Sequence, residues 1–580
     1  MSPHIPFRKM AMKIPGTRGS ALDLARGRLV VVSVFFALFY ILIAVRLFDL
    51  TILQGELQKD SMNVATPAPQ VTAEAEALRA DIVDRNGVLL ATSLETPSLY
   101  VDPAMVANPA QAAQDLTAAL PDLRYEDILQ KLQRKSRFVW IKRNLTPEEQ
   151  YKVLLIGEPG FAFKSEKRRI YPQGELAAHM VGYTNVDGMG LAGVERSFDK
   201  LLKAGGKPLT LTLDIRLQHI LRRETMAAMK EFSGTGAAGL VMDVGTGEIL
   251  AAVSLPDFDP HNPTAVGDAA VFNRLTLGVY ELGSTFKLFS TAALLEKNGG
   301  KLDMTFDARE PLVRGRFRIN DYHAEKRIMT VPEVFMVSSN IGAALMGEYV
   351  GTEGLQNFYS DLGFMAPSPL AIEEIGKPII PRPWRDINTL TASYGHGIAV
   401  SPLQMVTAAA TVLGDGIVVT PTIVAGHVKN NQNRRDLRVI SPQTAHRLRQ
   451  LMRLVVTDGT GNSADVPGYR VGGKTGTAEQ PGPRGGYDKR KLISSFLGVF
   501  PSDAPRYVVF VMVQDPKGTK ATYGYATGGW VGAPAVKHVI EALGPMMNVT
   551  PHVENADADI ATPLKRYIKA STEGKADATQ

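Results

Sequence analysis

The amino-acid sequence predicts an α+β protein in which an antiparallel sheet is flanked by helices. Two apolar runs, 237–244 and 248–253, flank Gly245-Thr246-Gly247 and together have the composition of a β-hairpin. Three more apolar segments late in the chain indicate further strands: 471–478, 495–500 and 507–513. Because helices and strands do not alternate as in βαβ units, α+β is favoured over a doubly wound fold.

The chain opens with a basic segment, residues 1–28, followed by an apolar one. The six lysines and arginines of the basic segment stand against Asp23 alone, so it carries five of the net six positive charges. Residues 29–50 are long and apolar enough to span a bilayer, and no small-residue cleavage site follows them. The sequence therefore favours an uncleaved transmembrane anchor over a removed signal peptide. Positive flanking charge predicts a cytoplasmic N-terminus and a periplasmic main chain in a bacterial inner membrane.

Composition excludes several classes of function. The basic excess lies in a leading tail and not on a folded domain, so no nucleic-acid partner is expected. The sequence contains no cysteine, which excludes a disulfide framework and any thiolate metal site. His179 has no second ligand at helical spacing, so we interpret it as structural and expect neither a metal nor a cofactor.

Residues 51–208 are expected to form a linker and a first α+β module. The stretch 55–78 is polar and rich in Pro and Ala, as linkers are. Asn86-Gly87 lies between two short apolar runs and predicts a hairpin turn. A helix is expected over 109–120, and the charged run 164–169 is interpreted as a solvated face.

The larger module is expected over 209–545. It begins with a strand that runs into a helix within 209–218. Residues 546–580 are dominated by small, polar and charged residues, so they are predicted to form a disordered tail.

The segment after Gly283 carries the first chemical signal. From Ser284 onward it is apolar on nearly every face until Gly299-Gly300, as expected of a buried helix that ends at a glycine. Residues three apart share a helix face, so the Lys287 amine can reach the Ser284 hydroxyl as a base reaches a nucleophile. The spacing alone is weak evidence, since Ser197 and Lys200 share it.

Two further motifs follow in a fixed order. They are Ser338-Ser339-Asn340 and then Lys474-Thr475-Gly476-Thr477. The order Ser-x-x-Lys, Ser-x-Asn, Lys-Thr-Gly is the established signature of penicillin-binding proteins and class A β-lactamases. Ser61-Met62-Asn63 also matches the middle motif, but it lies upstream of Ser284 and is out of order.

One segment also fits a nucleotide-binding pattern. Residues 468–475 match Gly-x4-Gly-Lys-Thr, the phosphate-binding P-loop. A P-loop needs a helix that begins at its lysine, whereas the residues after Thr475 are rich in glycine and proline and cannot propagate one. We therefore do not interpret this segment as a nucleotide site.

With these motifs, the chain resembles the class B penicillin-binding proteins over about residues 30–545. The resemblance implies a transpeptidase domain on an elongated α+β pedestal, with one N-terminal transmembrane helix. One departure is Leu282, where the family commonly has proline. Residues outside the three motifs that carry the resemblance are Arg79, Asp84 to Gly87, Tyr171-Pro172, Ala178-His179, Gly182-Tyr183, Gly190, Gly193, Glu195, 209–218, Asn273-Arg274, Gly459-Thr460, Gly528-Gly529 and Ala533-Pro534.

The resemblance implies a role for each polar residue of the motifs. Ser284 would attack the substrate carbonyl, and Lys287 would accept its proton. For that task the pKa of Lys287 must be lowered by burial and by a second cation, for which Lys474 is a candidate. Ser338 would pass a proton to the leaving group, and Asn340 would orient Lys287 and the substrate amide.

The third motif is implied to hold the substrate. By resemblance, Lys474, Thr475 and Thr477 engage the substrate carboxylate, and the backbone amides of Ser284 and Thr477 form the oxyanion hole. Gly476 is expected to let the substrate lie close to the strand, because a side chain there would block its approach.

The implied function is a serine D,D-transpeptidase that joins peptidoglycan stem peptides through an acyl-enzyme at D-Ala-D-Ala and is acylated by β-lactams. Ser-Ser-Asn, the 580-residue length and the short basic tail resemble the division-specific, septal branch. That branch implies a lipid-linked precursor glycan, a SEDS-type membrane glycan polymerase and division proteins as partners. An elongation-specific enzyme, a D,D-carboxypeptidase or β-lactamase, and a silent β-lactam sensor remain as alternatives.

Overall fold

The computed structural model describes residues 30, 32–44, 78–263, 269–426, 437–482, 486–552 and 559–568. It divides the chain into two units, Met1–Glu76 and Ala77–Gln580. Residues 30 and 32–44 are helical and exposed, whereas the basic tail and the remainder of the expected anchor and linker lie outside the described residues. Within the described part of the chain, no helix is both long and apolar enough to cross a membrane.

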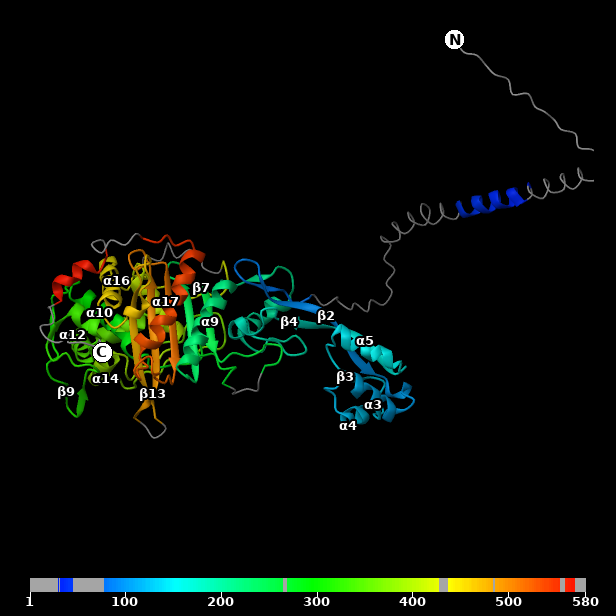
Figure 1. Ribbon diagram of the computed structural model, residues 1–580, viewed down its shortest axis with the longest axis horizontal. Helices are drawn as coiled ribbons and strands as arrows, with labels where there is room; N and C mark the ends of the chain where they lie inside the picture. The colour runs from blue at the N-terminus through cyan, green and yellow to red at the C-terminus, as the bar shows by residue number, and fades with distance from the viewer. Residues whose placement is uncertain are drawn as a thin grey trace, which may run out of the picture. The chain divides into compact units, whose positions relative to one another are not determined.

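The second unit begins with a five-stranded sheet built around β2, which pairs antiparallel with β1, β3 and β4. The predicted turn at Asn86-Gly87 joins β1 to β2, and the Asp84 carboxylate stabilises it by accepting from the amides of Asn86 and Val88. β5 pairs parallel with β1. The strands are β1 Ile82–Val83, β2 Leu89–Val101, β3 Val139–Lys142, β4 Phe161–Ile170 and β5 Leu209–Thr210 (Figure 1).

Short helices complete this first module. The predicted helix over 109–120 is α3, Pro109–Ala119, whose first turn is capped by Asn108 accepting from the amide of Gln111. Leu99 and Val101 of β2 and Leu116 of α3 are fully buried in one apolar core. The other helices are α4 Tyr125–Leu132, α5 Pro147–Ile156, α6 Ala178–Val181, α7 Gly193–Ser197 and α8 Asp199–Lys203, with 3₁₀ turns η3 Pro103–Met105 and η4 Gly174–Ala177.

The charged run 164–169 is not wholly solvated, so its interpretation as a solvated face is wrong at one position. Arg169 is buried, and its Nε donates to Glu195 at 2.6 Å. Arg79 donates to the other carboxylate oxygen of Glu195 at 2.6 Å. The fully buried Glu195 thus pairs with two arginines that are distant in sequence. The local charge pattern around Arg169 could not reveal this pairing.

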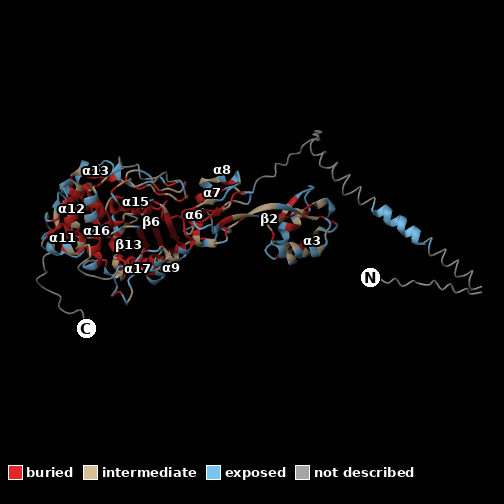
Figure 2. Cartoon of the chain, turned by 90° about the horizontal axis from the view of Figure 1, so that it is seen from above, coloured by how far each residue is buried: buried red, intermediate tan, exposed pale blue. Residues whose placement is uncertain are grey.

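The second module is organised around an antiparallel sheet of order β12-β13-β14-β6-β7, which confirms the predicted α+β class. Alternate residues of β14 enter different cores: Val509 and Val511 pack with α9 and α17, whereas Phe510 and Met512 pack with α10 and α15. Both faces are therefore covered, and the strands are largely buried (Figure 2), except at residues 487–491 of β13, which are mostly exposed. The bounds are β6 Gly236–Asp243, β7 Ile249–Leu255, β12 Gly472–Pro481, β13 Tyr487–Phe500, β14 Tyr507–Gln514, α9 Ile215–Glu231 and α17 Gly528–Met546.

Helices and two small two-stranded sheets occupy the sequence between β7 and β12. The 3₁₀ turn η5 Gly283–Phe286 leads directly into α10 Lys287–Lys297, nine of whose eleven residues are buried, as the predicted helix required. The remaining elements are α11 Val331–Val337, α12 Asn340–Val350, α13 Thr352–Asp361, α14 Asp386–Ala392, α15 Pro402–Leu413, α16 Pro442–Thr457, η8 Asn462–Ala464, and the strand pairs β8 Thr305–Asp307 with β11 Ile328–Thr330 and β9 Leu312–Arg314 with β10 Phe317–Ile319.

The C-terminal segment differs from the expected disordered tail. Residues 559–568 include the 3₁₀ turn η10, Thr562–Tyr567, and bury Ala561 and Leu564 against the main core. Asp559 accepts from Arg453 of α16 at 2.8 Å. The polar composition of the whole segment concealed these few apolar side chains and one ion pair, which fix its middle to the domain.

The buried ion triad predicts a stability effect. Replacing Glu195 by Gln removes the charge that compensates Arg79 and Arg169, and breaking a buried ion pair typically costs about 3–5 kcal/mol. We expect a loss of that order in the free energy of unfolding of the first module, measured by hydrogen exchange of its sheet. The same change at the exposed Glu126 serves as the control. A loss at Glu195 no larger than at Glu126 would show that the triad contributes little.

Candidate active site

Ser284 lies in a tight turn pressed against the edge strand of the sheet. Sequence predicted it at the start of the helix, and the structure places it in η5, one turn before α10. Gly283 has a φ of +57°, and a Cβ there would lie 2.8 Å from the carbonyl oxygen of Thr477. Glycine therefore permits both the backbone conformation and the close approach of the turn to β12.

The Lys287 amine is surrounded by oxygen atoms. Its side chain is only 1% exposed, and its Nζ lies 2.8 Å from Ser284 Oγ. The same nitrogen donates to the carbonyl oxygen of Ser338 at 2.6 Å and to Asn340 Oδ1 at 2.8 Å. A carbonyl or amide oxygen can only accept, so these two contacts use two amine hydrogens. In the neutral amine, the remaining lone pair is then free to accept from the Ser284 hydroxyl.

Lys474 brings a second buried amine from β12. Its side chain is fully buried, and its Nζ donates to Ser338 Oγ at 2.9 Å. Burial lowers the pKa of Lys474 to about 7. Burial, followed by the charge of Lys474, also holds the pKa of Lys287 well below its usual value, whereas the carboxylate of Asp321 opposes this shift. Lys474 can thus exchange a proton near neutral pH, and the lowered pKa of Lys287 favours its neutral form.

Ser338 occupies the space between the two amines. Its Oγ lies 3.1 Å from Lys287 Nζ as well as 2.9 Å from Lys474 Nζ. It follows the last turn of α11 with φ 63° and ψ 44°, in the left-handed region that is unusual for a residue with a side chain. This conformation lets the backbone carbonyl and the hydroxyl of one residue both face Lys287.

The remaining residues of the third motif lie along β12. Thr475 Oγ1 is 2.8 Å from Thr460 Oγ1, and Thr477 Oγ1 accepts from the amide of Gly528 at 3.1 Å. These contacts connect the strand to the segment after α16 and to the first residue of α17. The three motifs, far apart in sequence, therefore meet around one turn and one strand edge.

The surroundings of Gly476 give a second reason for glycine at this position, besides the expected approach of the substrate. A Cβ at this position would lie 2.3 Å from Ser495 Oγ, 2.8 Å from the carbonyl oxygen of Leu282 and 2.9 Å from Thr285 Cγ2. These atoms belong to the neighbouring strand and to the turn of Ser284. The glycine is thus required for packing η5 against the sheet.

His396 and two neighbouring tyrosines carried no sequence signal. The ring of His396 lies between those of Tyr394 and Tyr487, with centroids 5.1 and 5.2 Å away. Tyr487 Oη donates to Glu281 Oε2 at 2.9 Å, which joins β13 to the residues before η5. Burial and the charge of Lys287 lower the pKa of His396 to about 4. None of these residues belongs to a motif of fixed spacing, so their proximity is evident only in the folded structure.

The other sequence matches to a catalytic, nucleotide or metal site lie away from Ser284 or lack the structure that such a site needs. Lys474 lies within an extended strand, so the P-loop interpretation lacks the helix it requires. Ser197 and Lys200 lie on α7 and α8 of the first module, and Ser61 lies outside the described residues. His179 is buried and its Nε2 donates to the carbonyl oxygen of Ala270 at 2.8 Å.

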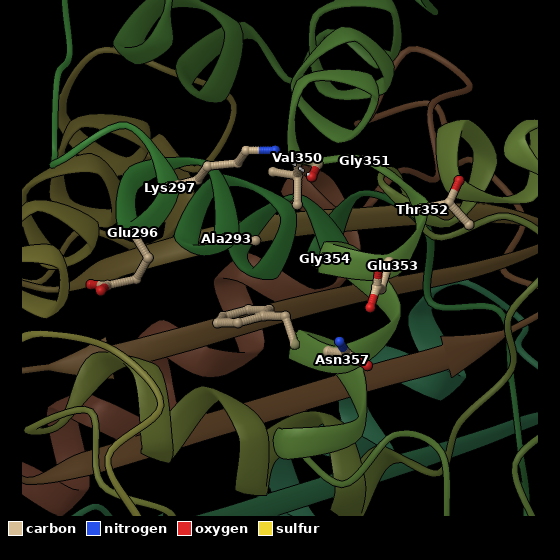
Figure 3. Close-up of a pocket in the computed structure, with 10 residues that line it drawn as sticks. Ala293, Glu296, Lys297, Val350, Gly351, Thr352, Glu353, Gly354 and Asn357 are labelled. Atoms are coloured by element: carbon tan, nitrogen blue, oxygen red, sulfur yellow. Dashed lines mark hydrogen bonds between the residues drawn. The ribbon is translucent and has the colours of Figure 1, made fainter.

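A surface pocket of about 680 Å³ lies at the opposite end of α10 from Lys287. Ala293, Glu296 and Lys297 contribute from that end of the helix, and Gly351 and Thr352 from the start of α13 (Figure 3). At 1.5 Å per residue, the helix separates Lys297 from Lys287 by about 15 Å. The pocket is therefore separate from the cluster around Ser284.

The buried amine of Lys474 predicts a pH dependence of stability. Its folded pKa of about 7 lies below the unfolded value of about 10.4, so between these pH values the unfolded chain binds a proton that the folded protein does not. This group therefore makes the folded protein more stable as pH rises through that range. Replacing Lys474 by Met should reduce the slope of unfolding free energy by about 1.4 kcal/mol per pH unit in urea titrations between pH 7.5 and 9.5. Equal slopes in both proteins would contradict a neutral, buried amine.

Comparison with known proteins places this arrangement in a family. Residues 237–541 match the penicillin binding protein transpeptidase domain, and residues 74–208 match the penicillin-binding protein dimerisation domain. The probable peptidoglycan D,D-transpeptidase FtsI of Caulobacter vibrioides is 39% identical over 486 residues, which is 82% of each chain. The peptidoglycan D,D-transpeptidase FtsI of Escherichia coli is 29% identical over 82% of this chain and 84% of its own.

A solved structure agrees with these matches. Penicillin-binding protein 3 of Mycobacterium tuberculosis, crystallised with aztreonam, superposes with a TM-score of 0.64 at 25% identity, over 82% of this chain and 98% of that one. The match to the transpeptidase domain alone covers more than half of the 580 residues, and the match to the dimerisation domain lies before it in the chain. The chain belongs to the class B penicillin-binding proteins.

Proposed function

We propose that this protein is a serine peptidoglycan D,D-transpeptidase that cross-links stem peptides through an acyl-enzyme formed at a D-Ala-D-Ala bond. The observation that carries the proposal is the 2.8 Å contact between Ser284 Oγ and the buried Nζ of Lys287. The curated relatives from C. vibrioides and E. coli are named peptidoglycan D,D-transpeptidases. The M. tuberculosis relative was solved with a β-lactam, which supports acylation by β-lactams here.

Acylation begins at the Ser284 hydroxyl. Its oxygen attacks the carbonyl carbon of the penultimate D-alanine while its proton passes to the Lys287 lone pair. The C–N bond to the terminal D-alanine then breaks, and the leaving amine takes a proton. Ser338 Oγ lies within 3.1 Å of both lysine nitrogens, so it can relay that proton from either amine. The product is a Ser284 ester and free D-alanine.

Transfer to the acceptor reverses these proton movements. The amine of a second stem peptide attacks the ester carbon, and its proton passes through Lys287 to the departing Ser284 oxygen. A new peptide bond forms, and Ser284 regains its hydroxyl. The same group therefore serves as base when the serine attacks and as acid when it leaves.

Substrate holding is assigned to β12 and the turn beside it. Lys474, Thr475 and Thr477 are proposed to bind the substrate carboxylate, and the amides of Ser284 and Thr477 to stabilise the oxyanion. The approach of η5 to β12 at Gly283 supports the second assignment, because it brings the Ser284 and Thr477 backbones together.

A septal role agrees with the Ser-Ser-Asn motif and with the match to FtsI proteins from two organisms. We propose a single-pass inner-membrane location with residues 1–28 cytoplasmic, an anchor at 29–50 and a periplasmic main chain. The proposed modules are 51–208 and 209–545, followed by the segment 546–580. A SEDS-type glycan polymerase and division proteins are the proposed partners.

The nucleophile is tested by penicillin labelling. Ser284→Ala should abolish covalent labelling, because no oxygen remains to form the ester, as measured by intact mass after exposure to a fluorescent penicillin. Ser197→Ala provides a matched control, since Ser197 has the same Ser-x-x-Lys spacing on the other module, and it should label normally. A one-drug mass increase in the Ser284→Ala protein would refute this assignment.

The base is tested separately. Lys287→Ala keeps the nucleophile but removes its proton acceptor, so the acylation rate constant should fall by roughly 10²–10⁴-fold. Non-covalent binding of the penicillin should weaken much less, which stopped-flow kinetics can resolve. An acylation rate within a few-fold of wild type would exclude Lys287 as the base.

A further inference from the structure

We propose that Asp321 is a positioning residue for acylation, whose carboxylate fixes the first turn of α12 and, with the adjacent carbonyl of Asn320, sets the Asn340 amide toward Lys287. The inference rests on the proposed function and deepens it. Neither residue belongs to the three motifs, and both follow the short strand β10.

The two oxygens of the Asp321 carboxylate bind the start of α12. Oδ2 accepts from the Ser339 hydroxyl at 2.8 Å, and Oδ1 accepts from the amide of Ile341 at 2.9 Å. Ser339 Oγ in turn accepts from the amide of Gly342 at 2.9 Å, as a helix N-cap does. An anionic group is also favoured at the N-terminus of an eleven-residue helix. The middle residue of Ser-Ser-Asn therefore connects Asp321 to the helix.

Asn340 is the first residue of that helix, and both ends of its amide are engaged. Nδ2 donates to the carbonyl oxygen of Asn320 at 3.1 Å, while Oδ1 accepts from Lys287 Nζ at 2.8 Å. Turning the amide over would place its oxygen against the Asn320 carbonyl oxygen and its NH₂ against the Lys287 N–H bonds. The Asn320 carbonyl thus determines which amide atom faces Lys287.

The hairpin that carries Asp321 is also attached farther along α12. The Arg314 guanidinium of β9 donates through Nε and Nη2 to the two carboxylate oxygens of Glu348, each at 2.8 Å. The segment from β9 to Asp321 therefore contacts α12 near both ends. Because Asp321 contacts the residues on either side of Asn340, its loss should disturb Asn340 before it disturbs the sheet.

Charge gives a second, independent consequence. The charged groups that shift the pKa of Lys287 are Lys474 from β12 and Asp321 from the segment after β10, and Lys287 in turn lowers the pKa of His396 from the segment after α14. Asp321 raises the pKa of Lys287, whereas burial and the charge of Lys474 lower it. Acylation needs the neutral amine, so the acid limb of the rate profile reports the pKa of Lys287. Removing the Asp321 charge should move that limb to lower pH.

The test compares Asp321→Asn with wild type and with Asp303→Asn, the same change at an exposed aspartate in the same region. Stopped-flow kinetics with a fluorescent penicillin separate the binding constant from the acylation rate constant. We expect Asp321→Asn to lower the acylation rate constant about tenfold, with little change in the binding constant, because a hydrogen bond to a charged group is lost. Its acid limb should shift to lower pH, and Asp303→Asn should match wild type.

A double-mutant cycle separates positioning from general destabilisation. If Asp321 acts through Asn340, Asp321→Asn should cost less than about twofold in an Asn340→Ala background. If the Asp321→Asn protein does not fold, Ser339→Ala is the substitute. It removes the hydroxyl that donates to Asp321 but keeps the Asp321 charge. It should therefore slow acylation without shifting the acid limb of the rate profile.

Three outcomes would overturn the inference. They are a wild-type acylation rate constant in Asp321→Asn, an equal loss in both backgrounds, and, where the substitute is needed, a wild-type rate in Ser339→Ala. Failure of the wild-type protein to be acylated at all would instead refute the proposed function, so the two failures are distinguishable.

Discussion

The enclosure of the Lys287 amine among oxygen atoms and away from water is the constraint on which the site depends. An ammonium removed from water is costly unless it is paired with a compensating charge, and Lys287 makes hydrogen bonds to hydroxyl, carbonyl and amide oxygens. Its neutral form is therefore favoured, and a neutral amine beside a hydroxyl is a base. The charge of the neighbouring Lys474 amine adds to this effect, and the Ser338 hydroxyl lies between the two amines.

Three separate pieces of chain create that enclosure. The turn η5 supplies Ser284, the junction of α11 and α12 supplies Ser338 and Asn340, and β12 supplies Lys474. Each piece is held by contacts of its own: glycine at 283 lets the turn approach the strand, a left-handed backbone at 338 turns two oxygens toward one nitrogen, and the sheet buries Lys474. The chemistry thus depends on packing between segments more than on any one motif.

The first module supports the segment that leads to the active turn. The amide of Tyr171 donates to His261 Nε2 at 3.0 Å, and Asn273 Nδ2 donates to the carbonyl oxygen of His179 at 3.4 Å. Glu374 accepts from the amide of Gly193 at 3.1 Å. The buried triad of Arg79, Arg169 and Glu195 lies beside these contacts in sequence and holds the same module together.

Sequence predicted the features that depend on local pattern. The buried helix after Ser284, the strand over 507–513 and the Asn86-Gly87 turn are each indicated by an apolar run or a turn chemistry that neighbouring residues determine. Other features depend on residues far away in the chain and could not be predicted. They are the ion pair of Arg169, the left-handed backbone of Ser338, the close packing around Gly476 and the contacts that hold residues 559–568 to the domain. Asp321 could not be predicted from sequence for the same reason. Its carboxylate contacts Ser339 and Ile341 only when the segment after the β9–β10 hairpin packs against α12.

In the proposed reaction, Ser284, assisted by Lys287, displaces a terminal D-alanine. The most direct measurement is tandem mass spectrometry of the intact protein and its peptides after brief exposure to a stem-peptide analogue that ends in D-Ala-D-Ala. We expect an adduct on Ser284 whose mass is that of the analogue less one D-alanine, together with released D-alanine. An adduct on any other residue, or one that retains both alanines, would contradict it.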